Sequence, residues 1–345
     1  MATGDIRAQL ELFGLDEALR LADAAGATRA ERARLRRRVE VAAEIMSEPP
    51  GADELGFLHS GLCQCYLPRT RPAQNSDAWA RRTGRFRLLV EPGTPRSDGG
   101  GADGGRWLPA SAADYVGVPF GTKARLLMFY LQREGVRSQT VPMGSSMSGW
   151  MRTMGLRVIG GERGTIAPLR EQALRLASCH FTLEWDSSDG TRAGLRRFRI
   201  ASGMESIGEA GGRWPEAVEL SREFRDHLRS HAVPLDSRAI AHLAGSALAL
   251  DLYAFLAHRL PRLRERLRLS WGAVTAQFGT ADTPPRKMAQ LIRDALAEVQ
   301  AAYPDARVEA AREGLLLCPS PPSVPARTLV AGGLRLIQRP GVGGG

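Results

Sequence analysis

Lysine is almost absent from this chain of 345 residues, although basic side chains are abundant. Only Lys123 and Lys287 are lysines among the 47 Lys and Arg residues. Long apolar runs are absent as well, since no stretch reaches the roughly 18 apolar residues of a transmembrane helix. Residues 1–30 show no basic start followed by an apolar core, so we expect no secretory signal. These absences predict a cytoplasmic protein without membrane contact.

Cysteine and aromatic residues are also scarce. Four cysteines are too few for a disulfide framework in a chain of this length, and with 6% aromatic residues the cores must consist mainly of Leu, Val, Ile and Ala. Cys63 and Cys65 form one C-x-C pair near His59, but no second pair supplies the ligands that zinc sites usually need. We expect free buried thiols, with a metal site at this pair as the alternative.

Sequence motifs of catalysis are missing. Residues 117–123 approach a phosphate-binding loop, but their spacing and Thr-Lys order are wrong, so Thr122 and Lys123 are expected to open a helix. His227 and His231 stand four residues apart without the glutamate of an H-E-x-x-H motif, which favours satisfied or exposed histidines over metal ligands. We therefore expect no enzyme, no catalytic residue, no metal and no cofactor. An enzyme acting on nucleic acid is the minor alternative.

The net charge of +10, from 47 basic and 37 acidic residues, favours a polyanionic partner. Residues 116–212 and 213–345 each carry a net charge of +5, so the excess lies in the C-terminal two thirds. Arginine suits phosphate and guanine recognition, whereas a GC-rich genome is the alternative cause of its excess over lysine. The dense basic run at 32–38 is interpreted as a solvated helix face, with a DNA-binding arm as the alternative.

Composition and breaker residues suggest five segments. An N-terminal helical extension is expected at 1–50, because the segment is rich in Ala, Arg and Glu and ends at Pro49 and Pro50. Strands are expected at 55–68 and 85–91, before a glycine-rich loop at 97–105. The five predicted segments are an extension (1–50), a strand-containing segment that packs on the first domain (51–115), two similar domains (116–212 and 213–328) and a flexible tail (329–345).

The two similar domains are inferred from an internal repeat. Residues 126–133 align with residues 252–259, both on helices with apolar periodicity. Each is followed by a short helix (146–154 and 271–278), a glycine turn, a basic helix and a strand pair. This order is typical of a helix-turn-helix followed by a β-hairpin. The sequence predicts a helix-rich α+β fold with two tandem winged-helix domains, which would contact successive faces of one double-stranded DNA site.

The third helix of each domain, its flanks and the first hairpin are the expected DNA-contact regions. Such side chains can reach phosphates and read guanine or adenine edges in a major groove. The alternative for each helix is an ordinary amphipathic surface helix, and for the hairpin a solvated strand face. The predicted contact residues are Arg163, Thr165, Arg170, Gln172 and Arg175 in the first domain, Arg192, Arg196 and Arg197 on its hairpin, and Arg286, Lys287, Gln290 and Arg293 in the second domain.

Several sequence blocks together resemble a known family. They lie at 55–63, 67–69, 88–93, 117–127, 130–132, 146–147, 154–156, 169–173, 314–317 and 319–325. This combination is similar to the plasmid-encoded RepA replication initiators of bacteria, from about residue 50 to about residue 325. Gly160–Arg163 departs from the lysine-bearing loop expected there.

The resemblance implies a non-enzymatic bacterial initiator. Such proteins bind repeated double-stranded sites in a plasmid origin, help to open the duplex, and recruit the host initiator and replicative helicase. They often repress their own promoter, and a homodimer is a possible form. A winged-helix transcriptional repressor without a role in replication is the alternative function.

Overall fold

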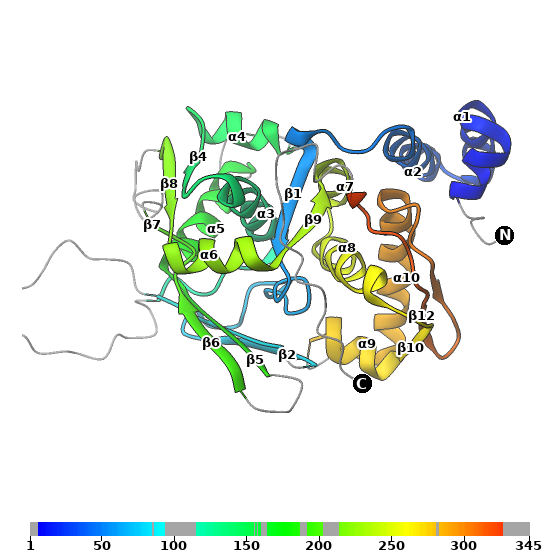
Figure 1. Ribbon diagram of the computed structural model, residues 1–345. Helices are drawn as coiled ribbons and strands as arrows, with labels where there is room; N and C mark the ends of the chain where they lie inside the picture. Colours follow the sequence, from blue (N-terminus) through cyan, green and yellow to red (C-terminus); the bar gives the residue numbers. More distant parts are fainter. Residues whose placement is uncertain are drawn as a thin grey trace, which may run out of the picture. The chain divides into compact units, whose positions relative to one another are not determined.

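A computed structural model describes residues 6–84, 86–93, 115–154, 156, 158–159, 164–186, 192–202, 214–280 and 283–326 (Figure 1). These residues form an α+β fold with ten α-helices, which confirms the predicted fold class at this level. They make two compact units: unit 1 takes the residues up to Phe57 and those from Val233 onward, and unit 2 takes Leu58 to Ala232. The glycine-rich loop at 97–105 and the tail at 329–345 lie outside the described residues.

The units divide the chain differently from the predicted segments. The extension at 1–50 belongs to unit 1 together with the C-terminal residues, and residues 214–232 belong to unit 2 rather than to the second predicted domain. Within the described residues, the chain therefore passes between the units twice. Both crossings fall within strands that pair with each other, β1 (Leu55–His59) and β9 (Ala232–Asp236).

Unit 1 is mainly helical and carries one small sheet. Its remaining elements are α1 (Ile6–Ala25), α2 (Arg29–Ser47), η1 (Ala52–Glu54), α7 (Ser237–Leu243), α8 (Ala247–Arg259), η4 (Leu260–Arg262), β10 (Leu267–Ser270), α9 (Trp271–Phe278), α10 (Pro285–Ala302), β11 (Val308–Ala310) and β12 (Gly314–Leu317). The strands form an antiparallel sheet in the order β10-β12-β11.

Apolar periodicity decides where α10 lies. Met288, Ile292, Leu296 and Val299 form one stripe at helical spacing, and all four are buried. The stripe faces α8, α9, α7 and α2 within unit 1. Because the other side of the N-terminal half is polar, α10 is buried on one face and exposed on the other.

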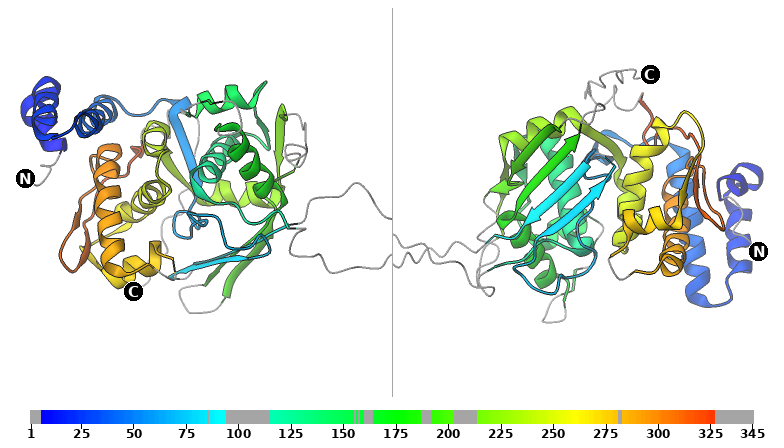
Figure 2. Two further views of the ribbon diagram at one scale, coloured as in Figure 1. Left: turned by 180° about the vertical axis from the view of Figure 1, so that it is seen from behind. Right: turned by 90° about the horizontal axis from the view of Figure 1, so that it is seen from below.

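Unit 2 combines two sheets with four α-helices. Its elements, besides its parts of β1 and β9, are β2 (Trp79–Thr83), β3 (Phe86–Glu91), α3 (Gly121–Arg137), β4 (Thr140–Pro142), α4 (Met147–Thr153), α5 (Ile166–Ser178), β5 (His180–Asp186), β6 (Arg192–Phe198), β7 (Ala201–Ser202), β8 (Ala217–Leu220) and α6 (Arg222–His231). The strands β2-β3-β5-β6 form an antiparallel layer with helices of this unit behind it (Figure 2), and β4-β8-β7 form a second sheet.

The predicted order of elements occurs twice. Unit 2 has α3, β4, α4, α5 and the β5–β6 hairpin, and unit 1 has α8, β10, α9, α10 and the β11–β12 hairpin. The short helix at 271–278 is confirmed at its predicted bounds, and Ser270 caps it by accepting a hydrogen bond from the Ala273 amide. The opening of α3 at Gly121, just before Thr122 and Lys123, is also confirmed.

One local prediction is wrong, and two threonines make contacts other than helix caps. The strand expected at 55–68 ends at His59, because turn hydrogen bonds such as Cys65 N–H to the Gly61 carbonyl bend the chain at 60–65. Helix α10 begins at Pro285 without a side-chain cap, and the Thr283 hydroxyl just before it accepts a hydrogen bond from the Thr280 amide. Thr165 occupies the N-cap position of α5, but its hydroxyl accepts from the Ile159 amide instead.

Candidate nucleic-acid interface

The four residues predicted on α10 lie on one exposed surface. Arg286, Lys287, Gln290 and Arg293 all occupy the N-terminal half of the helix, and all four side chains are exposed. The helix has no acidic residue in its first turn, so its positive dipole end adds to the charge of these side chains. We call these four residues the α10 face.

Two side chains of the α10 face are held by neighbours. The Gln290 amide donates to Asp294 Oδ1 at 3.0 Å. The guanidinium of Arg293 lies 5.2 Å from the centre of the Trp271 ring, where a cation is attracted by the aromatic face. The Trp271 indole in turn donates to the Arg312 carbonyl at 3.0 Å. These contacts orient a hydrogen-bonding amide and a cation before any ligand binds.

Sequence reasoning missed further arginines in unit 1. Arg264, Arg266 and Arg268 precede or lie within β10 at alternate positions, and Arg312 lies in the turn between β11 and β12; all four are exposed. Arg268 pairs with Glu313 at 3.0 Å. The alternation of arginine before a strand was the available signal, because a period of two places side chains on one side of an extended chain.

On α5 the structure corrects two predictions. Gln172 and Arg175 are buried, at 3% and 2% exposure, so neither side chain lies on the surface of unit 2. Gln172 accepts a hydrogen bond from the Phe120 amide at 2.8 Å. Arg175 donates to the Val118 carbonyl at 3.0 Å and to Asn75 at 2.9 Å. Both residues hold the segment that leads into α3, and we remove them from the contact set.

Burial and charge act in opposite directions on Arg175. Burial lowers the pKa of its guanidinium, while the charge and hydrogen bond of Glu171 raise it. Gly117 has a positive φ of 82°, and a Cβ there would come within 2.0 Å of Arg175 Nη1. The glycine is therefore required for this arginine to reach its partners.

The other predicted residues of unit 2 remain at or near its surface where they are described. Thr165 and Arg170 are half-buried. Arg197 is exposed on β6 and pairs with Glu91 at 3.3 Å. The structure describes the backbone of Arg192 and Arg196 within β6 but not their side chains, and Arg163 lies outside the described residues.

A half-buried carboxylate anchors the C-terminal half of α10. Glu298 accepts hydrogen bonds from Arg38 of α2 and from His242 of α7, with closest distances of 2.7 Å and 3.0 Å, and it also pairs with Arg34. Burial alone would raise the pKa of this carboxyl, but the hydrogen bonds and charges of these residues hold it well below its ordinary value. The N-terminal extension thus supports the helix that carries the α10 face.

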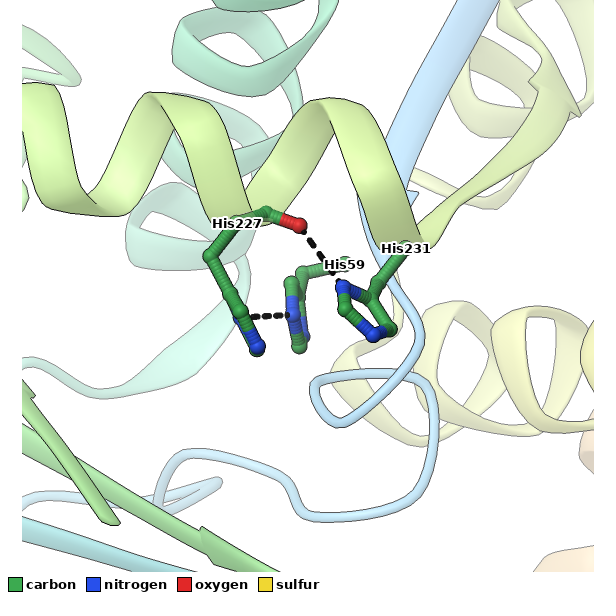
Figure 3. Close-up of side chains that lie close together, drawn as sticks. All are labelled: His59, His227 and His231. Carbon is green, nitrogen blue, oxygen red and sulfur yellow. Dashed lines mark hydrogen bonds between the residues drawn. The ribbon is translucent and has the colours of Figure 1, made fainter. Parts of the chain in front are cut away.

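Three histidines of unit 2 come together although the sequence placed only two of them side by side. His59, His227 and His231 each offer a ring nitrogen within 4.8 Å of the others (Figure 3). His59 lies 168 residues before His227, so no local spacing could reveal its approach. The four cysteines are free, and Cys63 and Cys65 are buried as predicted.

No helix among the described residues is both long and apolar enough to cross a membrane. A search of curated proteins finds no match to this chain. Two solved structures have TM-scores of 0.40 and 0.39 at 14% identity, a crystal structure of RctB domains 2-3 and one of selenomethionine derivatives of RctB domains 2 and 3. Each similarity covers 68% of this chain and 81% or 82% of the other.

The sequence model of one protein family matches residues 118–273, from just before α3 to the start of α9. The family is described as "Plasmid encoded RepA protein". The match includes several blocks on which the resemblance rests, and it leaves the blocks near both ends outside. Residues 118–273, somewhat less than half of this chain, are thus similar to the family of plasmid-encoded RepA proteins.

Proposed function

We propose that this chain is a plasmid replication initiator that binds repeated double-stranded sites in its origin through a winged helix in each unit. The family match supports the initiator role. The order helix, strand, helix, helix, hairpin in both units supports the winged helices. In unit 1, strand β10, which precedes the short helix, also pairs with strand β12 of the hairpin, in the sheet β10-β12-β11.

The α10 face carries this proposal. An amphipathic helix buries its apolar stripe and leaves Arg286, Lys287, Gln290 and Arg293 exposed. The fork of an arginine matches guanine O6 and N7, a glutamine amide matches adenine, and a lysine serves a phosphate. We propose that α10 enters the major groove and that Arg312, in the turn of the β11–β12 hairpin, contacts the DNA phosphate backbone.

The corresponding helix of unit 2 has a smaller share in reading bases. Since Gln172 and Arg175 are engaged inside the unit, Thr165 and Arg170 remain on α5, with Arg163 before it. We propose that these residues and the hairpin arginines contact mainly phosphates. Such contacts raise affinity without reading sequence.

A footprint on the DNA that flanks the gene tests the α10 face. Replacing Arg286 and Arg293 by Ala should abolish protection, since each base-reading arginine contributes about 1–3 kcal/mol. The matched control replaces Arg20 and Arg37, which are also exposed helical arginines of unit 1, and lowers the net charge equally. Thermal melts of all variants should stay close to that of the parent protein. Protection that survives in the α10 variant, or is lost in the control, contradicts the proposal.

Salt dependence gives a second measurement on the same protein. With 6–10 phosphate contacts, affinity should fall by about 10³–10⁵ between 50 and 200 mM salt. A flat response in gel shifts contradicts a phosphate-based interface.

The repressor alternative and the enzymatic alternative predict different results. Deleting the gene from its replicon should abolish maintenance of the plasmid, whereas a regulator alone would cause only derepression. Supercoiled origin DNA with added metal should remain unnicked, because we propose no catalytic role. Origin opening and recruitment of the host initiator and helicase follow from the family resemblance and belong to the proposal, as does a homodimeric form.

A further inference from the structure

Unit 2 contains a cluster of three imidazoles that the proposed DNA-binding role does not use. His59 ends β1 and is 2% exposed, while His227 is half-buried and His231 is exposed on α6. Their rings lie close together, with centroids 4.7 Å apart for His59 and His227 and 4.2 Å apart for His227 and His231 (Figure 3). The cluster is thus buried at one end and open to solvent at the other.

The fold brings these side chains together through backbone contacts. Residues four apart share one face of a helix, so His227 and His231 point the same way. The Ser60 amide donates to the His231 carbonyl at 2.9 Å, which fixes the end of β1 to the end of α6. The His59 amide donates to Gln132 at 2.8 Å, and Trp185 stacks on the His227 ring at 4.9 Å. The three rings are therefore held in place by their own unit.

Hydrogen bonds assign the protons on the rings. The Gly61 amide donates to Nδ1 of His59 at 3.0 Å, so a neutral His59 carries its proton on Nε2 and donates it to Nδ1 of His227 at 2.8 Å. His231 donates from Nδ1 to the His227 carbonyl at 3.0 Å, so its Nε2 carries a lone pair. Two of the three nitrogens that face the cluster already have the unprotonated form that a metal ion needs.

We propose that His59, His227 and His231 bind one divalent transition-metal ion of the zinc class. Imidazole nitrogens suit Zn²⁺, Co²⁺ and Ni²⁺, whereas Mg²⁺ and Ca²⁺ prefer oxygen ligands, which this cluster does not contribute. Three histidines leave a fourth position for water at the exposed His231 end. The ion would join β1 to α6 and stabilise unit 2.

Metal binding changes one tautomer and releases no proton. The lone pair of His231 Nε2 is ready to coordinate, and that of His227 Nδ1 becomes available when His59 stops donating to it. The proton on His59 Nε2 moves to its own Nδ1, and the hydrogen bond from the Gly61 amide is given up. The hydrogen bond from His59 Nε2 to His227 Nδ1 is lost as well, so three metal–nitrogen bonds replace two hydrogen bonds.

Zinc titration of the full chain without an affinity tag tests the site. After removal of metal with a chelator, Zn²⁺ in competition with a chromophoric chelator should bind at one ion per chain. His231→Ala, which changes an exposed side chain, should weaken binding by about tenfold or more. His180→Ala removes another histidine of unit 2 outside the cluster and should leave binding unchanged. Zn²⁺ should raise the melting temperature of the parent protein and not that of His231→Ala.

Cobalt distinguishes this site from cysteine ligation. Co²⁺ bound by nitrogen and water should give visible absorption without the near-ultraviolet band of a thiolate ligand, and His231→Ala should remove the absorption. Since His59 is buried, His59→Gln is informative only when its circular dichroism matches that of the parent. Absence of saturable binding, binding that His231→Ala leaves unchanged, or a thiolate band would each overturn the proposal.

Discussion

At the scale of single residues, long polar side chains serve both surface and core in this protein. Arg293 and Gln290 are exposed on α10, whereas Arg175 and Gln172, at similar predicted positions on α5, are buried. The periodicity of a helix identifies its apolar side. It does not reveal whether another segment of the protein also packs against the polar side. On α5 that neighbour is the segment before α3. Its Val118 carbonyl accepts a hydrogen bond from Arg175, and its Phe120 amide donates one to Gln172. The α10 face could be predicted from sequence because the described residues of unit 1 leave the polar side of the N-terminal half of that helix exposed.

Glu298 provides a prediction at this scale. Its pKa in the folded protein lies below the unfolded value of about 4.3, so the stability it confers is complete above that value and is lost as the pH falls. Glu298→Gln should destabilise unit 1 by about 3 kcal/mol at neutral pH, because it leaves the buried guanidinium of Arg38 without its charged partner. Urea unfolding between pH 3 and pH 7 measures the difference. An unchanged gap between variant and parent across this range would contradict the ionised state assigned to Glu298.

At the scale of elements, strands depend on close backbone approaches that composition does not show. Gly314 begins β12 opposite Ser270, and a Cβ there would lie 1.9 Å from the Leu269 carbonyl oxygen. Helix α9, by contrast, was predicted at its observed bounds, since a capping serine and local periodicity define it. Local signals therefore gave the helices, whereas the pairing of β3 with β5 and the approach of His59 to α6 arise from distant parts of the chain.

Gly314→Ala should separate β10 from β12 and destabilise unit 1 by about 2 kcal/mol, within the range of severe single substitutions. Gly245→Ala is the matched control, because nothing lies within 4 Å of a Cβ at that position in the same unit. Thermal denaturation followed by circular dichroism compares the two. Equal melting temperatures would show that the hairpin accommodates the methyl group.

At the scale of the whole molecule, each unit has its own core and its own order of helices and strands. Chain length indicated about two units, and the internal repeat indicated the order of helices and strands in each. The boundary at Ala232–Val233 could not be predicted, nor could the packing of α1 and α2 with the C-terminal elements of unit 1. Those features depend on contacts such as Arg38 with Glu298, which are 260 residues apart.

Separate cores predict separable unfolding. Calorimetry should resolve two transitions, of which Glu298→Gln lowers only one and added Zn²⁺ raises only the other. A single transition that both treatments shift would show that the units unfold together.

The discontinuity of unit 1 determines the order in which a ribosome can complete the protein. The described part of unit 2 emerges between the two parts of unit 1, so α2 leaves the exit tunnel long before Glu298 is translated. Until then α2 has α1 beside it but no α10 to pack against. A nascent chain halted before α10 is therefore a natural client for a chaperone, and premature termination there yields a product without the α10 face.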